Sequence, residues 1–446
     1  MEIIQNIFEG ISNLGSQIMI PLMIMIIGLI FRLGFAKSFR AGLTIGIGFI
    51  GVNMVTNYML ECLVPASNLL LDKFNLNLQY IDVGWTVGSA IAFSTSIGAF
   101  IIPFIIIINV IMLATKLTKT VNIDIWNYWH YAFCGAMVAT LTGNIVYGFI
   151  AAALQAALSL KVADLAADKV QSVIGIPGVS IPQGYAVSSV PLGLAMEWVY
   201  NKIPGFNKIK TDSETLSRRL GIFGEPATIG FVLGVLFGFL VGYGPKEAVT
   251  LGIQLGAVML ILPRMVKILM EGMVPISNAA RDMMNRRFAG KSFYIGMDSA
   301  ITLGHPTTIA AGILLVPITI LLAAVLPYNS MLPAADLAAG AFYVCMFTAL
   351  HHGDLVRTLI TGTVMQAFLL FSASYFAPAI TALAKANNYA FPEGAVGVTT
   401  AVNPFATLIA LIMQNKLIGA IIAIALVVAF FVICTMWEKK KAAKAS

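Results

Sequence analysis

The sequence predicts an all-α polytopic membrane protein with about eleven transmembrane helices and additional re-entrant or broken segments. Hydrophobic residues make up 59% of the 446-residue chain and charged residues only 11%, whereas soluble proteins carry about 25% charged residues. The mean hydropathy is +0.89. Uncharged runs recur at the length of about 20 residues that a helix needs to cross the hydrocarbon core. The short alternating segments typical of a membrane β-barrel do not occur.

The uncharged runs supply eleven candidate spans. Further apolar stretches at 171–182, 296–308 and 396–414 are too short, or too interrupted by Gly and Pro, to cross simply. The eleven candidates lie near 14–35, 41–60, 90–113, 131–159, 180–199, 226–243, 248–269, 309–326, 334–350, 357–376 and 417–437.

Lys and Arg residues are distributed unevenly between the predicted loops. They gather after the first and third spans, within 201–226, within 281–291 and in the C-terminal tail EKKKAAKAS. Cytoplasmic loops of membrane proteins carry such an excess. We therefore expect the N-terminus outside and the C-terminus inside, which requires an odd number of crossings. The net charge of +7 follows from the same bias, so we expect no nucleic acid partner.

Motifs for independent catalysis are missing. The chain contains no GxxxxGK[ST] phosphate loop, no HExxH and no GxSxG, so the sequence predicts neither nucleotide hydrolysis nor bond cleavage by this chain alone. The four cysteines are scattered without metal or redox spacing and are expected to be packing residues. We expect no metal ion and no cofactor.

An internal duplication is visible in two similar stretches. RAGLTIGIGFIGV begins at Arg40 and KEAVTLGIQLGAV begins at Lys246, and both contain a basic start, a Thr four positions on and a Gly-Ile pair. The predicted topology gives them opposite directions, so the halves are predicted to be inverted repeats, as in many secondary transporters. Chance similarity between membrane helices is the alternative. The predicted division is 1–200 for the first half, 201–225 for a cytoplasmic linker, 226–400 for the second half and 401–446 for a terminal span and basic tail.

Each half also offers an Asp followed by a His. The first half has Asp124 and His130, and the second has Asp298 and His305. A spacing of seven predicts that Asp298 and His305 share one helical face, whereas the spacing of six is poorer. Ionisable residues at bilayer depth are costly and usually functional. The alternative for the first pair is an interfacial position within an aromatic belt that includes Trp126.

Three further polar segments keep two interpretations each. GIPGVSIPQG, at 175–184, contains two Pro and three Gly, which excludes a continuous helix and indicates a re-entrant or unwound element or an extracellular turn. The group of His351, His352, Asp354 and Arg357 is either a site or a solvated loop at a cytoplasmic span end. Glu225 precedes a Pro at a predicted helix start, where it is either part of a site or a helix cap.

Eight sequence blocks resemble the galactitol-type permeases of the bacterial phosphoenolpyruvate-dependent phosphotransferase system, the membrane C component of enzyme II. They are FRAGLTIGIGFIGV, FNLNLQYIDVGW, VNIDIWNYWH, KIPGFNKIK, FGEPATIGFVLG, LPRMVKILMEGMVPI, IGMDSAITLGH and HHGDLVRTLITG, and IPQG adds a ninth with Gln183 where the family often has His. The family is also similar to the ascorbate permeases of that system. That resemblance implies a homodimer with eleven spans, a core domain, a scaffold domain and inverted repeats.

The resemblance implies a multi-pass protein of the bacterial cytoplasmic membrane that binds a sugar alcohol and moves it inward by an elevator motion. A separate B subunit, served by an A subunit, phosphorylates the substrate, so no residue of this chain is expected to carry phosphate. The basic stretches 201–225 and 271–296 either dock the B subunit or only reflect the positive-inside bias. By resemblance, the substrate-binding residues are Asp82, Trp85, Trp129, His130, Gln183, Gly184, Asp298 and His305.

Rival classes make different predictions. An ion-coupled symporter of a polar solute would also have inverted repeats and intramembrane Asp and His residues, but its uptake would depend on an ion gradient and give no phosphorylated product. A channel would show passive flux without saturation. The sequence does not identify which polyol or sugar is carried.

Overall fold

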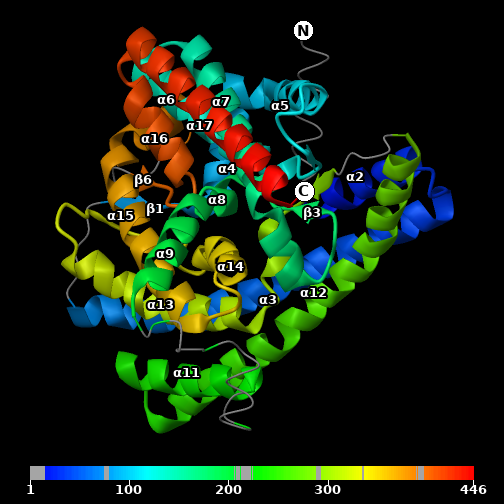
Figure 1. Ribbon diagram of the computed structural model, residues 1–446. Coiled ribbons are helices and arrows are strands. Elements are labelled where there is room, and N and C mark those ends of the chain that lie inside the picture. The colour runs from blue at the N-terminus through cyan, green and yellow to red at the C-terminus, as the bar shows by residue number, and fades with distance from the viewer. Residues whose placement is uncertain are drawn as a thin grey trace.

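The computed structural model describes residues 16–74, 80–204, 206, 211, 222, 225–287, 293–333, 336–387, 389 and 396–445. Helices dominate these ranges, and the strands among them are short (Figure 1). Up to residue 202 the elements are α2 (Ser16–Ile30), α3 (Phe35–Phe74), β1 (Tyr80–Asp82), α4 (Gly84–Ser94), α5 (Ser96–Ala114), β2 (Thr120–Asn122), η1 (Trp126–Tyr128), α6 (Trp129–Thr142), α7 (Ile145–Ile174), β3 (Val179–Ser180), α8 (Gly184–Val187) and α9 (Val190–Lys202).

The second part of the chain continues the helical pattern. Its elements are α11 (Pro226–Val241), α12 (Pro245–Arg287), β4 (Tyr294–Gly296), η4 (Ser299–Thr302), α13 (Pro306–Val325), β5 (Met331–Leu332), η5 (Leu337–Gly340), α14 (Ala341–Leu350), α15 (Leu355–Ala386), β6 (Val396–Gly397), α16 (Pro404–Met413) and α17 (Lys416–Ala445).

Six helices in the described ranges are long and apolar enough to cross a membrane: α5, α7, α12 over Pro245–Leu262, α13, α15 and α17 as far as Glu438. Shorter apolar helices are α11 over Ala227–Val241, α14 and α16. The prediction of a helical, polytopic membrane protein is therefore confirmed. The count of eleven crossings stays a prediction.

Four helices form an arm beside a more compact body. Helix α3 has 40 residues and α12 has 43, so both extend well beyond the predicted spans 41–60 and 248–269. They pack along one another, with α2 against α3 and α11 against α12, and Figure 1 shows them along the lower and right-hand margin. Gly234 and Gly252 allow α11 and α12 to approach closely, because a Cβ at Gly234 would lie 2.7 Å from the Cα of Gly252.

Two small parallel sheets lie inside the body. In one sheet β1 lies between β5 and β6, and in the other β4 lies between β2 and β3. Ile81 pairs with Leu332 and Val396, while Ile295 pairs with Val121 and Val179. Each sheet therefore joins strands from distant parts of the chain and brings the polar residues that follow those strands together.

The predicted single span at 131–159 is wrong. Helix α6 ends at Thr142 and α7 begins at Ile145. Gly143 takes the left-handed conformation with φ of 70°, which glycine adopts without strain. Asn144 then caps α7 by accepting the backbone N–H of Val146. The uncharged run is therefore two helices, because hydropathy does not register a turn made by Gly and Asn.

The interruption predicted at 175–184 is confirmed. Helix α7 ends at Ile174, Gly175 has φ of 72°, and β3 follows before Gln183 caps α8. A turn in which Pro177 is exposed precedes β3, and β3 pairs with β4, so the segment contains both an exposed turn and a strand that is buried in the body.

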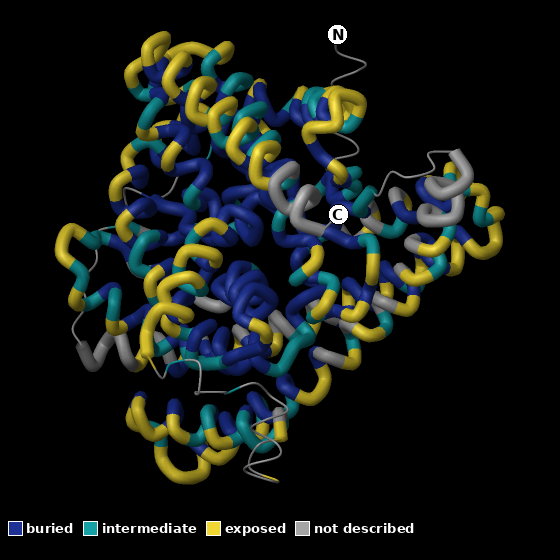
Figure 2. Tube along the Cα trace, viewed as in Figure 1, coloured by how far each residue is buried: buried dark blue, intermediate teal, exposed yellow. Residues whose placement is uncertain are grey.

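Burial separates the centre of the body from its periphery (Figure 2). The buried residues of the body concentrate around the strands and α6, α7, α14 and α15, whereas outer helices expose large apolar side chains such as Ile418, Ile421 and Ile433 of α17. Apolar surface of this extent fits a lipid environment.

Candidate substrate site

A cavity opens where η1, α6, α8 and η4 meet the arm. It holds ≈ 540 Å³ of space between atoms, counting space open to solvent. Its lining residues are Phe49, Trp85, Trp126, Asn127, Trp129, His130, Gln183, Tyr185, Asp298, Ala300, Ala339, Phe342 and Thr400.

The lining combines aromatic walls with a few polar groups. Asp298 is the carboxylate of the set, and the set contains no Lys or Arg. The site therefore suits a ligand with apolar C–H faces and several hydroxyl groups, since it offers no cation for an acidic ligand.

His130 lies in the first turn of α6 and is 1% exposed. Its ring stacks near Trp129, with centroids 3.8 Å apart, and lies 6.3 Å from the ring of Tyr185. Within the described part of the chain, neither ring nitrogen has a hydrogen-bond partner. A buried polar group without a partner is costly, so this imidazole is a candidate for ligand binding.

Asp298 and Gln183 both line the cavity, and the hydroxyl of Ser299 contacts an oxygen of each side chain. Oδ1 of Asp298 accepts the backbone N–H of Ala300 at 2.8 Å, which caps η4. Oε1 of Gln183 accepts the N–H of Ala186 at 2.9 Å and the hydroxyl of Ser299 at 3.1 Å. The Nε2 group of Gln183 keeps its hydrogens for a ligand, because its oxygen is the atom used in capping.

The structure brings together five of the eight residues expected to bind substrate: Trp85, Trp129, His130, Gln183 and Asp298. Gly184 lies directly behind His130, because a Cβ there would be 2.8 Å from the Cβ of His130. Asp82 and His305 are outside the lining. Asp82 is buried and accepts backbone N–H groups, as described below, and His305 caps α13 through Nδ1, which accepts the N–H of Thr307 at 3.2 Å.

The expectation that Asp298 and His305 share one helical face is wrong. Asp298 caps the short 3₁₀ helix η4, and His305 caps the separate helix α13. Both residues cap helix N-termini, and Pro306 is the first residue of the new helix α13. Spacing alone predicted a continuous helix where the chain makes two caps.

Several residues of the cavity lining are not among those predicted from the sequence. Asn127 lies within the block VNIDIWNYWH but carries no charge. Thr400 lies in the apolar stretch 396–414, which Gly and Pro interrupt too often for a simple crossing. Phe49 comes from the arm and also lines a second cavity of ≈ 380 Å³ with Asp124 and Asp298. Gly and Pro interruptions next to polar residues were the signal that could have identified Thr400.

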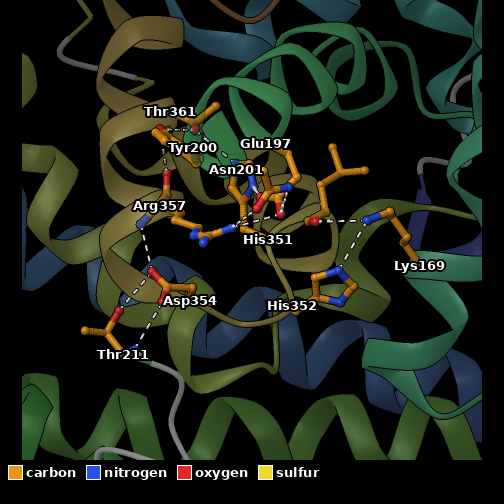
Figure 3. A network of polar contacts seen from close by, with 11 residues as sticks. Lys169, Glu197, Tyr200, Asn201, Thr211, His351, His352, Asp354, Arg357 and Thr361 are labelled. Atoms are coloured by element: carbon orange, nitrogen blue, oxygen red, sulfur yellow. Dashed lines mark hydrogen bonds and ion pairs between the residues drawn. The ribbon is translucent and has the colours of Figure 1, made fainter. Parts of the chain in front are cut away.

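A second polar cluster joins α9 to α14 and α15, away from the cavity lining (Figure 3). Glu197 binds Nδ1 of His351 at 2.7 Å and Nη1 of Arg357 at 2.9 Å. Nε2 of His351 contacts Oγ1 of Thr361 at 3.0 Å, and Tyr200 shares the same hydroxyl at 2.8 Å. This cluster fixes α9 against the start of α15.

Asp354 anchors one residue of the predicted linker. It caps α15 by accepting the N–H of Arg357 at 2.9 Å, and it accepts both the N–H and the hydroxyl of Thr211 at 3.1 and 2.9 Å. Asp354, His351 and Arg357 are buried, so they do not form a solvated loop, whereas His352 is exposed. Glu225 takes the N-cap position of α11 without a side-chain capping bond.

The electrostatics of the cluster follow from its contacts. Glu197 contacts His351 through one carboxylate oxygen and Arg357 through the other, so both of its oxygens are paired. Burial lowers the pKa of His351, against the opposing effect of Glu197. Arg357 therefore supplies the lasting positive charge that Glu197 needs.

A family model described as the PTS system sugar-specific permease component, EIIC-GAT, matches residues 10–394. The chain belongs to this family of permeases. It is 43% identical over 422 residues to the "Putative permease IIC component" of Escherichia coli K12, covering 94% of this chain and 97% of that protein. It is 38% identical over 368 residues to the "PTS system galactitol-specific EIIC component" of the same organism, covering 82% of each chain. The galactitol-specific protein of Escherichia coli O157:H7 matches equally.

The permease family fits the composition of the cavity. In the described ranges no group of three or more His, Cys, Asp or Glu side chains is arranged to hold a metal ion. The cavity lining in these ranges offers hydrogen-bonding groups and aromatic side chains.

Proposed function

We propose that this permease binds a galactitol-like sugar alcohol in the cavity and moves it inward for phosphorylation by a separate B subunit. The observation that carries the proposal is the buried His130 imidazole, without a partner in the described chain, in an aromatic cavity with Asp298 and Gln183. The similarity to a galactitol-specific EIIC component supports the choice of substrate class. The name of the relative at 43% identity specifies no substrate, so hexitols other than galactitol are tested as well.

Hydroxyl groups match these side chains chemically. Each hydroxyl donates one hydrogen bond and accepts others, so Asp298 accepts while the amide hydrogens of Gln183 donate. Neutral His130 does one of each. Trp85 and Trp129 cover the C–H faces of the carbon chain. Direct ligand contact by Asp82, Gly184 and His305 remains the prediction of the family resemblance.

Phosphorylation completes the transport step. The phosphate passes from soluble phosphocarriers through the A and B subunits to the bound alcohol, and this chain carries no phosphate itself. The product is trapped because a phosphate ester with nearly two negative charges does not recross the hydrocarbon core. When the phosphocarriers carry radioactive phosphate, the label should appear on the sugar alcohol and not on this chain. Radioactive phosphate bound to the chain would refute that part of the scheme.

The order of elements supports two inverted repeats. One half runs α2, α3, β1, α4, α5, β2, η1, α6, α7, β3 and α8, and the other runs α11, α12, β4, η4, α13, β5, η5, α14, α15, β6 and α16. The central strands of the two sheets, β1 and β4, fall at the same place in this order. The stretches that begin at Arg40 and Lys246 lie in α3 and α12, which also correspond. The same order extends the second half past the predicted boundary at 400 to include α16.

The arm of α2, α3, α11 and α12 is the proposed scaffold, and the remaining helices are the core that carries substrate as an elevator. Phe49 of the arm and Ala300 of the core line both cavities. They therefore lie at the boundary along which the core is proposed to move against the scaffold. A disulfide between Phe49→Cys and Ala300→Cys, in a chain whose native cysteines are replaced, should block uptake reversibly. Full uptake by the cross-linked protein would contradict the elevator.

The predicted assembly is a homodimer in the bacterial cytoplasmic membrane, in contact with lipid. The charge bias predicts an outside N-terminus and an inside C-terminus, and the eleven uncharged runs supply the odd number of crossings that this orientation requires. The basic stretches 201–225 and 271–296 face the cytoplasm in this topology and are the proposed contact for the B subunit. Most of their side chains lie outside the described residues. Native mass spectrometry in lipid nanodiscs tests the dimer, and a monomer would contradict it.

The alternative is an ion-coupled symporter of a polar solute. The decisive experiment is uptake into membrane vesicles with purified phosphocarriers and with the B subunit present or absent, using hexitols, pentitols and hexoses. The proposed function predicts a phosphorylated hexitol product and uptake that requires the B subunit. Uptake of unmodified solute that collapses with the ion gradient would support the symporter instead.

A further inference from the structure

The side chain of Asn127 bridges two carboxylates from different parts of the chain. Its Nδ2 atom donates to both oxygens of Asp124, at 2.9 and 2.9 Å, and to Oδ2 of Asp298, at 2.8 Å. An amide nitrogen has two hydrogens, so one is shared by the Asp124 oxygens and the other points to Asp298. The reversed amide orientation would set an oxygen against two carboxylates, so the contacts determine the orientation.

The segment that carries Asn127 is held firmly. The backbone N–H of Ile123 binds the carbonyl of Gly296 at 3.1 Å, which continues the pairing of β2 with β4. The N–H of Asp124 binds Oδ1 of Asn122 at 3.1 Å, and the hydroxyl of Tyr128 binds the carbonyl of Asn122 at 3.0 Å. Asn127 thus acts on Asp298 from a fixed position, 171 residues away in sequence.

The Asn127 amide lies between two carboxylates that would otherwise repel each other. Asp124 is buried and Asp298 is half-buried, and no Lys or Arg in the described chain forms an ion pair with either carboxylate. Two carboxylates that share a site repel each other unless a donor or a proton lies between them. The Asn127 amide supplies two donor hydrogens at that place without adding charge. It is 6% exposed and lines the cavity, so it also reaches the space where a ligand lies.

We propose that Asn127 is a positioning residue for substrate binding, which fixes the carboxylate of Asp298 toward the cavity by a hydrogen bond that Asp124 holds in place. Oδ2 of Asp298 has two acceptor positions. Asn127 fills one and directs the other to a hydroxyl of the ligand. This inference rests on the proposed function, because it concerns how the same cavity recognises a polyol.

The first measurement is galactitol binding by the purified full-length chain. The fluorescence of the tryptophans that line the cavity reports the binding. Loss of a hydrogen bond to a charged group changes binding by about 10- to 100-fold. Asn127→Ala and Asn127→Asp should weaken galactitol binding by about that factor. The matched control is Asn144→Asp, the same chemical change at the cap of α7, where Asp caps as well as Asn. Equal affinities for the Asn127 variants and the unaltered chain would overturn the proposal.

A double variant separates positioning from charge. Asn127→Asp combined with Asp124→Asn keeps one amide and two carboxylates in the cluster but removes the donor that faces Asp298. The proposal predicts that the double variant remains impaired. Recovery to the affinity of the unaltered chain would mean that only the total charge of the cluster matters, and it would overturn the positioning role.

Electron cryomicroscopy gives a readout that needs no substrate. In Asn127→Ala the carboxylate of Asp298 should leave its present position, while it should stay in Asn144→Asp. An unmoved Asp298 in Asn127→Ala would refute the proposal. If the unaltered chain binds no galactitol, the substrate assignment of the proposed function fails, and the position of Asp298 still decides the role of Asn127.

Discussion

Asp82 and Asp336 are joined by a hydrogen bond from the backbone N–H of Asp336 to Oδ2 of Asp82, at 2.8 Å. The other oxygen of Asp82 accepts the N–H of Gly84 at 3.2 Å. Asp336 accepts the N–H of Trp85 at 2.8 Å, so the pair holds the backbone of an aromatic residue of the cavity wall. The two carboxylates thereby connect loops that lie 254 residues apart in sequence.

Asp82→Ala should reduce the stability of the permease more than Asp82→Asn does. The alanine leaves the buried N–H groups of Gly84 and Asp336 without their acceptor, which costs about 2–4 kcal/mol in total. The asparagine retains one acceptor oxygen. Thermal unfolding in detergent, followed by tryptophan fluorescence, measures the difference. Equal midpoints for the two variants would contradict the supporting role of this carboxylate.

Gly184→Ala should weaken galactitol binding by about tenfold or more, because a Cβ displaces His130. The new atom would lie 2.8 Å from the Cβ of His130, closer than side-chain carbons pack. The matched control is Gly340→Ala, where the added atom meets Tyr343 no closer than 3.7 Å. Calorimetric titration of both variants makes the comparison. Unchanged affinity in Gly184→Ala would show that the contact between α8 and α6 does not set the position of His130.

Asp354→Ala should expose the segment 201–225 to protease. The substitution removes the acceptor for the N–H and hydroxyl of Thr211, together with a helix cap worth about 1 kcal/mol. Limited proteolysis followed by mass spectrometry measures cleavage within the segment. Asn144→Ala is the control, because it removes the corresponding cap of α7 without touching Thr211. Equal cleavage rates for the two variants would mean that Asp354 does not anchor the segment.

Glu197→Gln should lower thermal stability at neutral pH, and the deficit should shrink on acidification. Glu197 lies 2.9 Å from Nη1 of Arg357, and this ion pair is lost when the carboxylate is protonated. A carboxyl group of this kind stabilises the fold above its unfolded pKa and loses that contribution as pH falls through its folded pKa. Thermal midpoints measured from about pH 7 to about pH 2.5 test this, because the contribution is lost only below the unfolded pKa of about 4.3. A constant difference across that range would contradict it.

Composition predicted the class of fold because the physical requirement is coarse: apolar runs in lipid must be helical. Helix boundaries depended on local chemistry that hydropathy ignores. Gly143 and Asn144 turn the chain inside an uncharged run, and α3 continues as a helix from Phe35 to Phe74 although its last part carries charges. Backbone hydrogen bonds keep such a helix intact whether lipid or protein surrounds it.

The cavity was partly predictable for a related reason. Asp298, His130 and Gln183 could be predicted because an ionisable residue or a break in a helix within the membrane costs free energy and is usually functional. Asn127 and Thr400 are neutral and unremarkable in sequence, and their roles come only from parallel strand pairing that places distant loops side by side. The arm residue Phe49 lies in the lining because α3 packs across the body, which no local pattern encodes.

The central claim is that His130 and Asp298 bind a sugar alcohol in one cavity, and calorimetric titration of galactitol into the purified permease tests it most directly. The unaltered chain should bind, while His130→Ala and Asp298→Asn should each weaken binding by about 10- to 100-fold and leave thermal unfolding close to that of the unaltered chain. Binding of undiminished affinity by both variants would contradict the claim.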